Sequence, residues 1–575
     1  VGLVVLMAVG LRASGIVILA IPVSIMIGIG FVDLSGYGLE QMSIAGLVIA
    51  LGLLVDNAIV VIENISRFMK MGYSKKEAAV KGTSQIAWAV VSSTTTTVLA
   101  FIPIMMMQNI TGDFIRSMPV TVVYTLSASL LISLILTPYL STKFLKITDV
   151  QKERKMRKFL NHEIENRYRK TLNFGLKKPK IIVLIALIVF TGSLTLFPLV
   201  GVSFFPKAEK PQFIININTP DGTNLDRTDQ ITQYVDSLLI NRSEIQHYAI
   251  NVGHGNPRIY YNVIPRRNAS THAQFFITLK ERNLDIFNRL ISDLRGQLKG
   301  VPGAKIEVKE FEQGPPVEAP VAVRVLGDNL NILKEISRDV EEIITSTRGT
   351  VNINNPLSTS KTDIHVKINL DKAGFLGVPL VDIDKTVRAA VAGLTISKFR
   401  DLEGKEYDMV IRLPFTGKID YEDLDKIYVS SVTGAQIPLK QVANIQFTAS
   451  SMLINHYNLE RNVTITSDVE SDLSVDQVTK EIISQLESYN WPKGYRYSMG
   501  GELESREESF GGMAKAGIVA IIGIFAVLVL QFRSYTQPLI VFSAIPLAII
   551  GSLFALLITG NSFSFTAFIG LTSLV

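Results

Sequence analysis

Long apolar runs alternate with polar segments along this chain and predict seven membrane-crossing helices. A run of about 20 apolar residues forms a helix of roughly 30 Å, which matches the hydrocarbon core of a bilayer. Such runs occur at 13–32, 43–62, 86–107, 118–140, 181–200, 514–532 and 538–558, with shorter apolar stretches at 1–9 and 565–575. Because the chain begins without Met and ends inside an apolar stretch, we expect it to be an excerpt of a longer protein.

The segment between these spans follows a different pattern, with short alternating runs separated by amphipathic ones. Alternation predicts strands, and apolar residues three and four apart predict helices. The first half has the order β-α-β-β-α-β of a split βαβ unit, with strands at 211–219, 246–252, 273–280 and 304–309 and helices at 223–240 and 283–298. The sequence Gly-Pro-Pro at 314–316 marks its end.

A second unit of the same kind follows and is interrupted by an insertion. Its segments are a strand at 319–326, a helix at 329–346 and, after the insertion, a strand at 462–468, a helix at 474–488 and a strand at 495–499. Within the insertion, the runs 395–402 and 406–413 predict a hairpin that turns at Glu403-Gly404-Lys405.

Together these patterns predict an α-helical polytopic membrane protein with a large α+β region of split βαβ (ferredoxin-like) subdomains and an internal two-fold repeat. The expected parts are transmembrane helices in 1–200 with a connector at 141–180, a first subdomain at 201–313, a second at 314–360 and 456–512, an inserted subdomain at 361–455, and transmembrane helices in 513–575.

Charge is unevenly distributed and sets the expected orientation. Segment 141–180 has thirteen Lys and Arg against four acids, and segment 63–85 has five against two. Both lie on one side if the spans alternate, as the positive-inside rule requires of cytoplasmic loops. Residues 201–512 then lie on the opposite side, and the net charge of +6 reports topology rather than a nucleic-acid partner. Within the connector, i+4 spacing over 152–174 predicts an amphipathic helix, on the membrane surface or on the protein's own cytoplasmic face.

Two landmarks recur along the chain. Ala20-Ile21-Pro22 returns as Ala544-Ile545-Pro546, and Gly46-Leu47 returns as Gly570-Leu571, both at an offset of 524 residues. The same offset within the same order of spans indicates an internal duplication, which is common in secondary transporters.

Asp56 is the most informative residue, because it is an acid inside the apolar run 43–62. It lies about 5 Å from the middle of that span. A charged carboxylate is costly at this depth, so such residues usually serve protons, ions or substrates. Burial also raises the pKa of an acid toward neutral pH. We therefore predict that Asp56 carries a proton, and the alternative is an acid held by a neighbouring helix for packing specificity alone.

The composition excludes several classes of site. There is no Cys, so the chain forms neither a disulfide framework nor a thiolate metal site. Residues 201–400 contain no Met, which argues against a methionine relay for a soft metal such as Cu(I). The sequence lacks both a G-x-x-x-x-G-K-[ST] motif and a nucleophile elbow. We expect no enzyme activity and no cofactor.

The segment 52–64, GLLVDNAIVVIEN, resembles the fourth-helix motif of the resistance–nodulation–division (RND) efflux pumps, in the branch that exports hydrophobic and amphiphilic drugs. The repeat, the basic connector and the two split βαβ units extend this resemblance over the whole chain, from the end of the second helix to the start of the tenth. It implies a homotrimeric, proton-driven antiporter of the bacterial inner membrane. Amphiphilic substrates would leave through a periplasmic adaptor protein and an outer-membrane channel, with 201–313 as a pore subdomain and 361–455 as the docking subdomain.

The resemblance also implies roles for residues of the motif. The family commonly carries paired acids at the positions of Asp56 and Asn57, facing a Lys on the tenth helix, which the 524-residue offset places five positions beyond Val575. Asn57 departs from this pattern and leaves the proton stoichiometry open, because an amide does not titrate in this range. Glu63 lies two turns from Asp56 on the same face, either as part of a proton path or as a solvated helix end. The hydroxyl run 92–97 serves either helix packing or a proton wire.

The drug pocket of this family lies in the soluble domains and is rich in Phe. Aligning 276–282 on the equivalent strand places one pocket position at Phe276, which is otherwise a core residue of an alternating strand. The stretch 253–267 offers further candidates in His254, Arg258, Tyr260 and Tyr261. Aromatic and cationic groups favour flat or anionic amphiphiles, and a solvated loop is the alternative.

Two other functions remain open. One is metal-ion export, because some metal exporters of the same superfamily keep only the first acid of the pair. The other is a membrane scaffold or sensor that has lost its coupling, with Asn57 as the trace of that loss.

Overall fold

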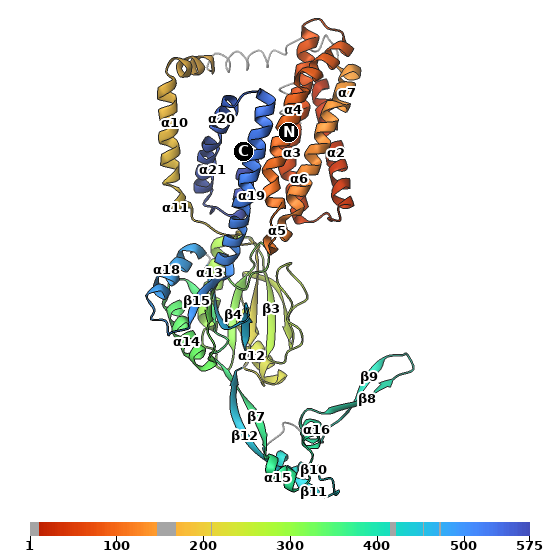
Figure 1. Cartoon of the computed structure of the whole chain (residues 1–575), viewed down its shortest axis with the longest axis vertical. Coiled ribbons are helices and arrows are strands. Elements are labelled where there is room, and N and C mark those ends of the chain that lie inside the picture. Colours follow the sequence, from red (N-terminus) through yellow and green to blue (C-terminus); the bar gives the residue numbers. More distant parts are fainter. Residues whose placement is uncertain are drawn as a thin grey trace. The chain divides into compact units, whose positions relative to one another are not determined.

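The computed structural model describes residues 11–145, 168–208, 210–414, 421–451, 453–470 and 473–574. The chain divides into two compact units, the first made of residues 1–355 and 464–575 and the second of residues 356–463. The first unit holds the membrane helices and two α/β sheets (Figure 1).

Within the described residues, seven helical segments are long and apolar enough to cross a membrane, which confirms the seven spans expected from the sequence. Their helices are α2 (Leu11–Leu34), α3 (Gln41–Lys70), α4 (Lys75–Met105), α6 (Ser117–Leu134), α10 (Pro179–Leu194) with α11 (Phe197–Val200), α19 (Gly501–Phe532), and α20 (Thr536–Phe542) with α21 (Ile545–Thr559). Shorter helices are α5 (Ile110–Ile115), α7 (Leu136–Phe144) and α22 (Phe565–Leu574). Most of the amphipathic helix predicted at 152–174 lies outside the described residues.

Two of these helices begin well before their apolar runs. α4 starts at Lys75, because Ser74 and Glu77 form a capping box in which each side chain accepts the backbone N–H of the other. α19 starts at Gly501, so the polar residues 502–512 form the first turns of a helix that continues into the apolar run. The predicted start of this span at 514 is therefore too late, since hydropathy reports only its apolar part.

Small residues bring α3 close to its neighbours. A Cβ on Gly46 would lie 2.5 Å from the carbonyl oxygen of Met118 in α6, and one on Gly82 in α4 would lie 3.1 Å from Cα of Ile65. Close backbone approach is how membrane helices associate, because lipid tails supply no hydrophobic driving force. Figure 1 shows α2, α3, α4, α6 and α7 gathered into one bundle as a result.

The first α/β sheet has the predicted order β-α-β-β-α-β. Its elements are β1 (Gln212–Asn218), α12 (Leu225–Leu239), β2 (Ile245–Val252), β3 (His272–Leu279), α13 (Leu284–Leu298) and β4 (Lys305–Glu310). The strands pair antiparallel in the order β2-β3-β1-β4. Alternate residues of β1, namely Phe213, Ile215 and Ile217, are fully buried in a core shared with α12 and α13. The residues between them point to the opposite face of the sheet.

The second sheet contains β5 (Val321–Leu326), β14 (Glu460–Val469) and β15 (Arg496–Gly500), with helices α14 (Leu330–Ser346) and α18 (Val475–Ser488). These are the elements predicted for the second split βαβ unit. β6 (Thr350–Asn354), which pairs with β14, was not predicted. It is short, and Asn352 within it has a φ of 53°, so it shows no regular alternation.

The second unit has its own core of fully buried apolar residues, among them Val429, Leu439 and Val442. The predicted hairpin is present as the pair β8 and β9, with Gly404 at a φ of 86° in its turn. The elements of this unit are β7 (Ser360–Ile368), α15 (Leu370–Phe375), α16 (Leu380–Val391), β8 (Leu394–Arg400), β9 (Glu406–Ile411), the 3-10 helix η1 (Tyr421–Lys426), β10 (Tyr428–Ser430), β11 (Gln436–Pro438), α17 (Leu439–Val442), β12 (Ala443–Ser451) and β13 (Asn455–Tyr457).

We expect Gly46→Ala to destabilise the protein, because the new methyl group would overlap the carbonyl of Met118. Overpacking of this kind costs about 1–3 kcal/mol. The matched control is Gly52→Ala in the same helix, where a Cβ meets nothing within 4 Å. That change is expected to stabilise α3 by about 0.5–1 kcal/mol. The measurement is the unfolding temperature in detergent, and equal stability of the two variants would contradict the close approach.

Candidate functional site

The predicted proton carrier and its neighbour differ in their surroundings. Asn57 is half-buried between α3 and α4, where its Oδ1 accepts a hydrogen bond from the Thr94 hydroxyl (3.4 Å). Asp56 lies on the exposed side of α3 and has no hydrogen-bond partner among the described residues. The structure therefore holds the amide in place and leaves the carboxylate on an uncovered helix face.

This uncovered face of α3 runs along the helix. It includes Val48, Asp56, Val60 and Glu63, all of them exposed in the described chain. Glu63 thus shares a face with Asp56, as its spacing predicts. In a membrane, such a face must be covered by other helices or by lipid. Contact of the ionised Asp56 carboxylate with lipid would be costly in free energy.

The hydroxyl run in α4 divides into two kinds of contact. Thr95 and Thr97 donate hydrogen bonds to backbone carbonyls of their own helix, at 2.8 Å and 3.0 Å. Only Thr94 is bonded to α3. Most of the run therefore satisfies its hydroxyls locally, as expected for a helix surface in an apolar medium.

Asn64 fixes the relation between α3 and α4. Its Nδ2 donates to the carbonyl of Gly82 (2.7 Å) and to Oε1 of Gln85 (3.1 Å), and the residue is 9% exposed. Ser129 of α6 donates in addition to the carbonyl of Leu54, two residues before Asp56 (3.2 Å). Hydrogen bonds from two neighbouring helices therefore hold the part of α3 that carries Asp56.

The second candidate region is an aromatic face on the first sheet, opposite α12 and α13. We use this name for Phe276, Tyr260 and Phe311 with the apolar residues Ile214, Ile259 and Val263. The Phe311 ring lies 5.0 Å from Tyr260 and 6.2 Å from Phe276, between centroids. The structure thus brings Phe276 and Tyr260 together through Phe311, which the sequence analysis missed because it lies beyond the next strand of the chain.

A cation lies beside this face. Nζ of Lys210 is 4.8 Å from the centroid of the Tyr260 ring, and Lys210 is exposed. Burial raises the pKa of Tyr260, so its hydroxyl stays neutral at physiological pH. His254 and Arg258 are exposed on the same loop, and His254 contacts the carbonyl of Gly255 (2.7 Å).

The loop 253–269 that carries these residues is anchored to the sheet by buried amides. Gln274 of β3 accepts the backbone N–H of Asn256 (2.8 Å), and its own amide donates to Oδ1 of Asn216 in β1 (2.8 Å). Asn218 accepts from Arg266 of the loop (2.7 Å) and contacts Nδ1 of His272 (2.9 Å). The loop is therefore held in one place and is not simply a solvated connection.

The sequence profile of the AcrB/AcrD/AcrF family matches residues 1–575. The chain belongs to the AcrB/AcrD/AcrF family. This result confirms the resemblance to RND transporters and the fold class predicted from the sequence.

Relatives of the family cover the chain almost completely. It is 24% identical to the swarming motility protein SwrC of Bacillus subtilis (strain 168), over 98% of this chain and 53% of SwrC. It is 26% identical to the multidrug resistance protein MdtC of Klebsiella pneumoniae, over 98% of this chain and 54% of MdtC. The chain thus spans about half the length of these curated relatives.

A solved heavy metal efflux pump has the same fold, with a TM-score of 0.76 at 18% sequence identity, over 100% of this chain and 56% of that one. Among the described residues of this AcrB/AcrD/AcrF chain, no three His, Cys, Asp or Glu side chains are grouped so that they could hold a metal ion.

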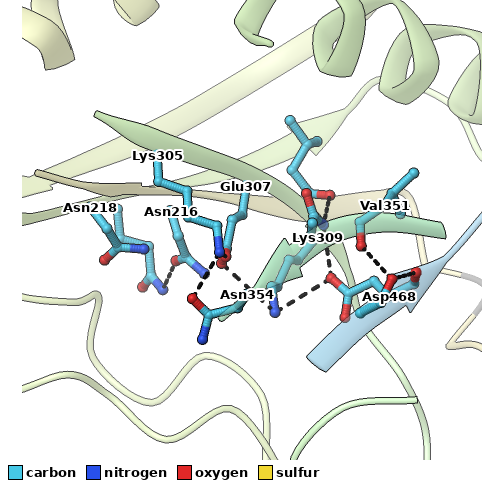
Figure 2. Close-up of polar contacts among 12 residues, drawn as sticks. Asn216, Asn218, Lys305, Glu307, Lys309, Val351, Asn354 and Asp468 are labelled. Atoms are coloured by element: carbon cyan, nitrogen blue, oxygen red, sulfur yellow. Dashed lines mark hydrogen bonds and ion pairs between the residues drawn. The ribbon is translucent and has the colours of Figure 1, made fainter. Parts of the chain in front are cut away.

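The two sheets of this AcrB/AcrD/AcrF chain meet through charged side chains at β4 (Figure 2). Lys309 lies 3.8 Å from Glu307 in the same strand and 3.4 Å from Asp468 in β14. Lys305 pairs with Glu307 (3.3 Å) and donates to Oδ1 of Asn354 in β6 (2.8 Å). Each of these lysines therefore lies near a carboxylate, either in its own strand β4 or in β14 of the other sheet.

Glu312, just beyond β4, is the exception in this charged junction. Burial, and after it the nearby carboxylates of Asp468 and Glu502, raise the pKa of Glu312 to about 7, against the opposing effect of the cations Lys207 and Lys309. Its folded state therefore binds a proton more tightly than an unfolded chain, in which the pKa is 4.5.

We expect the contribution of Glu312 to stability to fall as the pH rises from 4.5 to about 7, because the carboxyl loses its proton in a buried site. Glu312→Gln removes this loss and should stabilise the protein above pH 7 by about 1–3 kcal/mol, while leaving it unchanged below pH 4.5. Thermal unfolding across this pH range is the measurement. The control is Glu481→Gln on the exposed side of α18, which should match the wild type at every pH. A Glu312→Gln variant whose unfolding temperature also follows the wild type at every pH would disprove the assignment.

Proposed function

We propose that this chain is part of a proton-driven efflux transporter of the bacterial inner membrane, a drug/H+ antiporter that exports amphiphilic small molecules. Membership of the AcrB/AcrD/AcrF family supports efflux transport. The observation that carries the proton-driven mechanism is Asp56, a lone acid near the middle of α3 on a face that the described chain leaves uncovered. A single acid can still carry one proton per cycle, although Asn57 does not titrate.

Protonation of Asp56 changes what its helix face can contact. In the neutral form the side chain can lie against apolar surroundings, whereas the ionised form needs water or a cation. Because α3 is bonded to α4 through Asn64 and to α6 through Ser129, a change in the preferred partner of Asp56 acts on the bundle and not on one side chain. Binding and release of the proton can in this way switch the helix bundle between two arrangements.

The aromatic face is the proposed substrate site. Phe276 and Tyr260, both half-buried, offer ring surface to a flat molecule, and the buried Phe311 packs against both rings. Lys210 beside Tyr260 offers a positive charge to an anionic group. The ring of Tyr261 contacts that of Tyr260, at 4.7 Å between ring centroids. Arg258 adds positive charge on the same loop, next to the exposed His254 ring, and the preferred substrates are flat, anionic amphiphiles.

The partners proposed for this protein follow its family. They are two further copies in a homotrimer, a periplasmic adaptor protein and an outer-membrane channel, with the α/β region in the periplasm. The second unit, residues 356–463, is the proposed docking subdomain. Its β8–β9 hairpin supports this role, because Phe399, Tyr407 and Met409 are 57%, 53% and 46% exposed on a two-stranded ribbon.

Two alternatives have less support. Metal-ion export would need a cluster of donor side chains, and none is found among the residues that the structure describes. An uncoupled scaffold or sensor has no use for an acid at this depth of the membrane. Titration of Asp56 distinguishes this second alternative from transport.

Asp56→Asn is expected to abolish export, because the amide has nearly the same shape but carries no proton. The assay is accumulation of a fluorescent amphiphile, anilinonaphthalene sulfonate, in cells that lack other efflux pumps. Asp33→Asn at the exposed end of α2 is the matched control and should export normally. Normal export by Asp56→Asn, with both variants present in equal amounts, would refute the proposal. Glu63→Gln separates a proton path, which would slow export, from a solvated helix end, which would not.

Lys210→Gln is expected to raise the KM for anilinonaphthalene sulfonate up to about fivefold, since an exposed ion pair with the sulfonate is worth up to about 1 kcal/mol. Export of ethidium, a flat cation, should be unchanged or improved by the same substitution. Phe276→Ala should weaken the export of both anilinonaphthalene sulfonate and ethidium, because it removes ring surface on which either molecule would stack. Equal losses for the two probes with Lys210→Gln would show that the charge plays no part in selection.

A further inference from the structure

A ring contact connects the membrane helices to the loop of the aromatic face. Phe114 of α5 is stacked on Tyr261, with ring centroids 5.6 Å apart and planes at 18°. α5 is the short helix between α4 and α6. Tyr261 in turn contacts Tyr260, which belongs to the aromatic face. Two membrane helices and the proposed substrate site therefore meet at this pair of rings.

On the membrane side, α5 is locked to the ends of its neighbours. Asn109 caps it by accepting the N–H of Gly112 (2.8 Å), and donates to Ser509 of α19 (3.1 Å). Arg116, at the other end of α5, donates to the carbonyl of Met107 (2.6 Å) and pairs with Asp113 (3.0 Å). A displacement of α4 or α19 is thus transmitted to α5 as a whole.

On the loop side, Tyr261 is equally constrained. Its hydroxyl accepts the backbone N–H of Gly314 (2.8 Å), and the next residue, Asn262, donates to the carbonyl of Glu312 (2.8 Å). Gly314 leaves no space for movement, because a Cβ there would lie 2.4 Å from the ring of Phe205. The ring of Tyr261 is therefore held at its hydroxyl and through the next residue, and it contacts Tyr260 at 4.7 Å between ring centroids.

The other end of this connection is the proton site. Thr94, which bonds Asn57 beside Asp56, belongs to α4, the helix that leads directly to α5. The described residues thus form a continuous line from Asn57, the chain neighbour of Asp56, through α4 and α5 to Phe114, Tyr261 and the aromatic face.

We propose that the Phe114–Tyr261 ring stack is the coupling contact through which the protonation state of Asp56 alters the aromatic face. This role rests on the proposed function and adds Phe114 to it as a positioning residue that does not touch substrate. A stacked ring pair is worth roughly twofold to tenfold in an equilibrium between two arrangements. Loss of the stack should therefore slow the coupled cycle without changing the substrate site itself.

The test uses Phe114→Leu, which keeps an apolar side chain and removes the ring. Export and equilibrium binding of anilinonaphthalene sulfonate are measured in proteoliposomes that contain the intact protein under a proton gradient. We expect the maximal rate to fall roughly twofold to tenfold, with unchanged binding affinity and unchanged KM. Phe114→Tyr keeps the stacked ring and leaves Tyr261 with its hydrogen bond, so it should retain the rate. The double variant Phe114→Leu/Tyr261→Leu should be no slower than Tyr261→Leu alone, because both changes break one contact.

Phe31→Leu is the matched control, because Phe31 also pairs with a tyrosine of the bundle, Tyr124, at 5.8 Å. Among the described residues, Phe31 makes no ring contact with the loop 253–269. A Phe114→Leu variant with an unchanged rate, or one that loses rate and affinity together, would overturn the coupling role. Asp56→Asn in the same vesicles separates the two proposals. If wild-type export does not depend on Asp56, the proposed function fails and this inference fails with it; if it does, only the outcome with Phe114→Leu decides.

Discussion

Asn64 ties α3 to α4 at a point where Gly82 leaves no room for a side chain between the helices. Asn64 is only 9% exposed, so a hydrogen bond lost there would leave a buried amide without a partner, and this contact sets the rotation of α3 against α4. The place of Asp56 depends on it, since the acid lies on the same helix about two turns away. The contact of Thr94 with Asn57 depends on it as well, because both lie along the same pair of helices.

The contact between the two α/β sheets differs in kind from the packing within each of them. Their own cores are apolar, but their contact at β4 consists of Lys305, Glu307, Lys309 and Asp468 (Figure 2). Charged pairs gain little over water, but an unpaired member is costly to bury. Such a contact is therefore specific in register and moderate in strength, and the neighbouring Glu312 makes it sensitive to pH.

The aromatic face combines residues from three different segments of the chain. Phe276 comes from a sheet strand, Tyr260 from the anchored loop and Phe311 from the segment after β4. Gln274 and Asn216 hold the loop from below by amide hydrogen bonds, while Phe114 contacts it from the membrane side. The same loop thus carries proposed substrate contacts and meets the helices of the proton site.

The sequence by itself determined the seven spans, the two split βαβ units and the hairpin of the second unit, because run length and alternation are local properties of the chain. It also singled out Asp56, since one acid in an apolar run is visible without any neighbour. Only the tertiary structure decided that Asp56 faces outward while Asn57 is bonded to Thr94, since hydropathy does not report which side of a helix its neighbours cover. The tertiary structure alone also identified Phe311 and Lys210 beside the proposed substrate site and Phe114 in its contact with Tyr261. Their contacts join segments that are distant along the chain, and such contacts follow from packing, which no local pattern encodes.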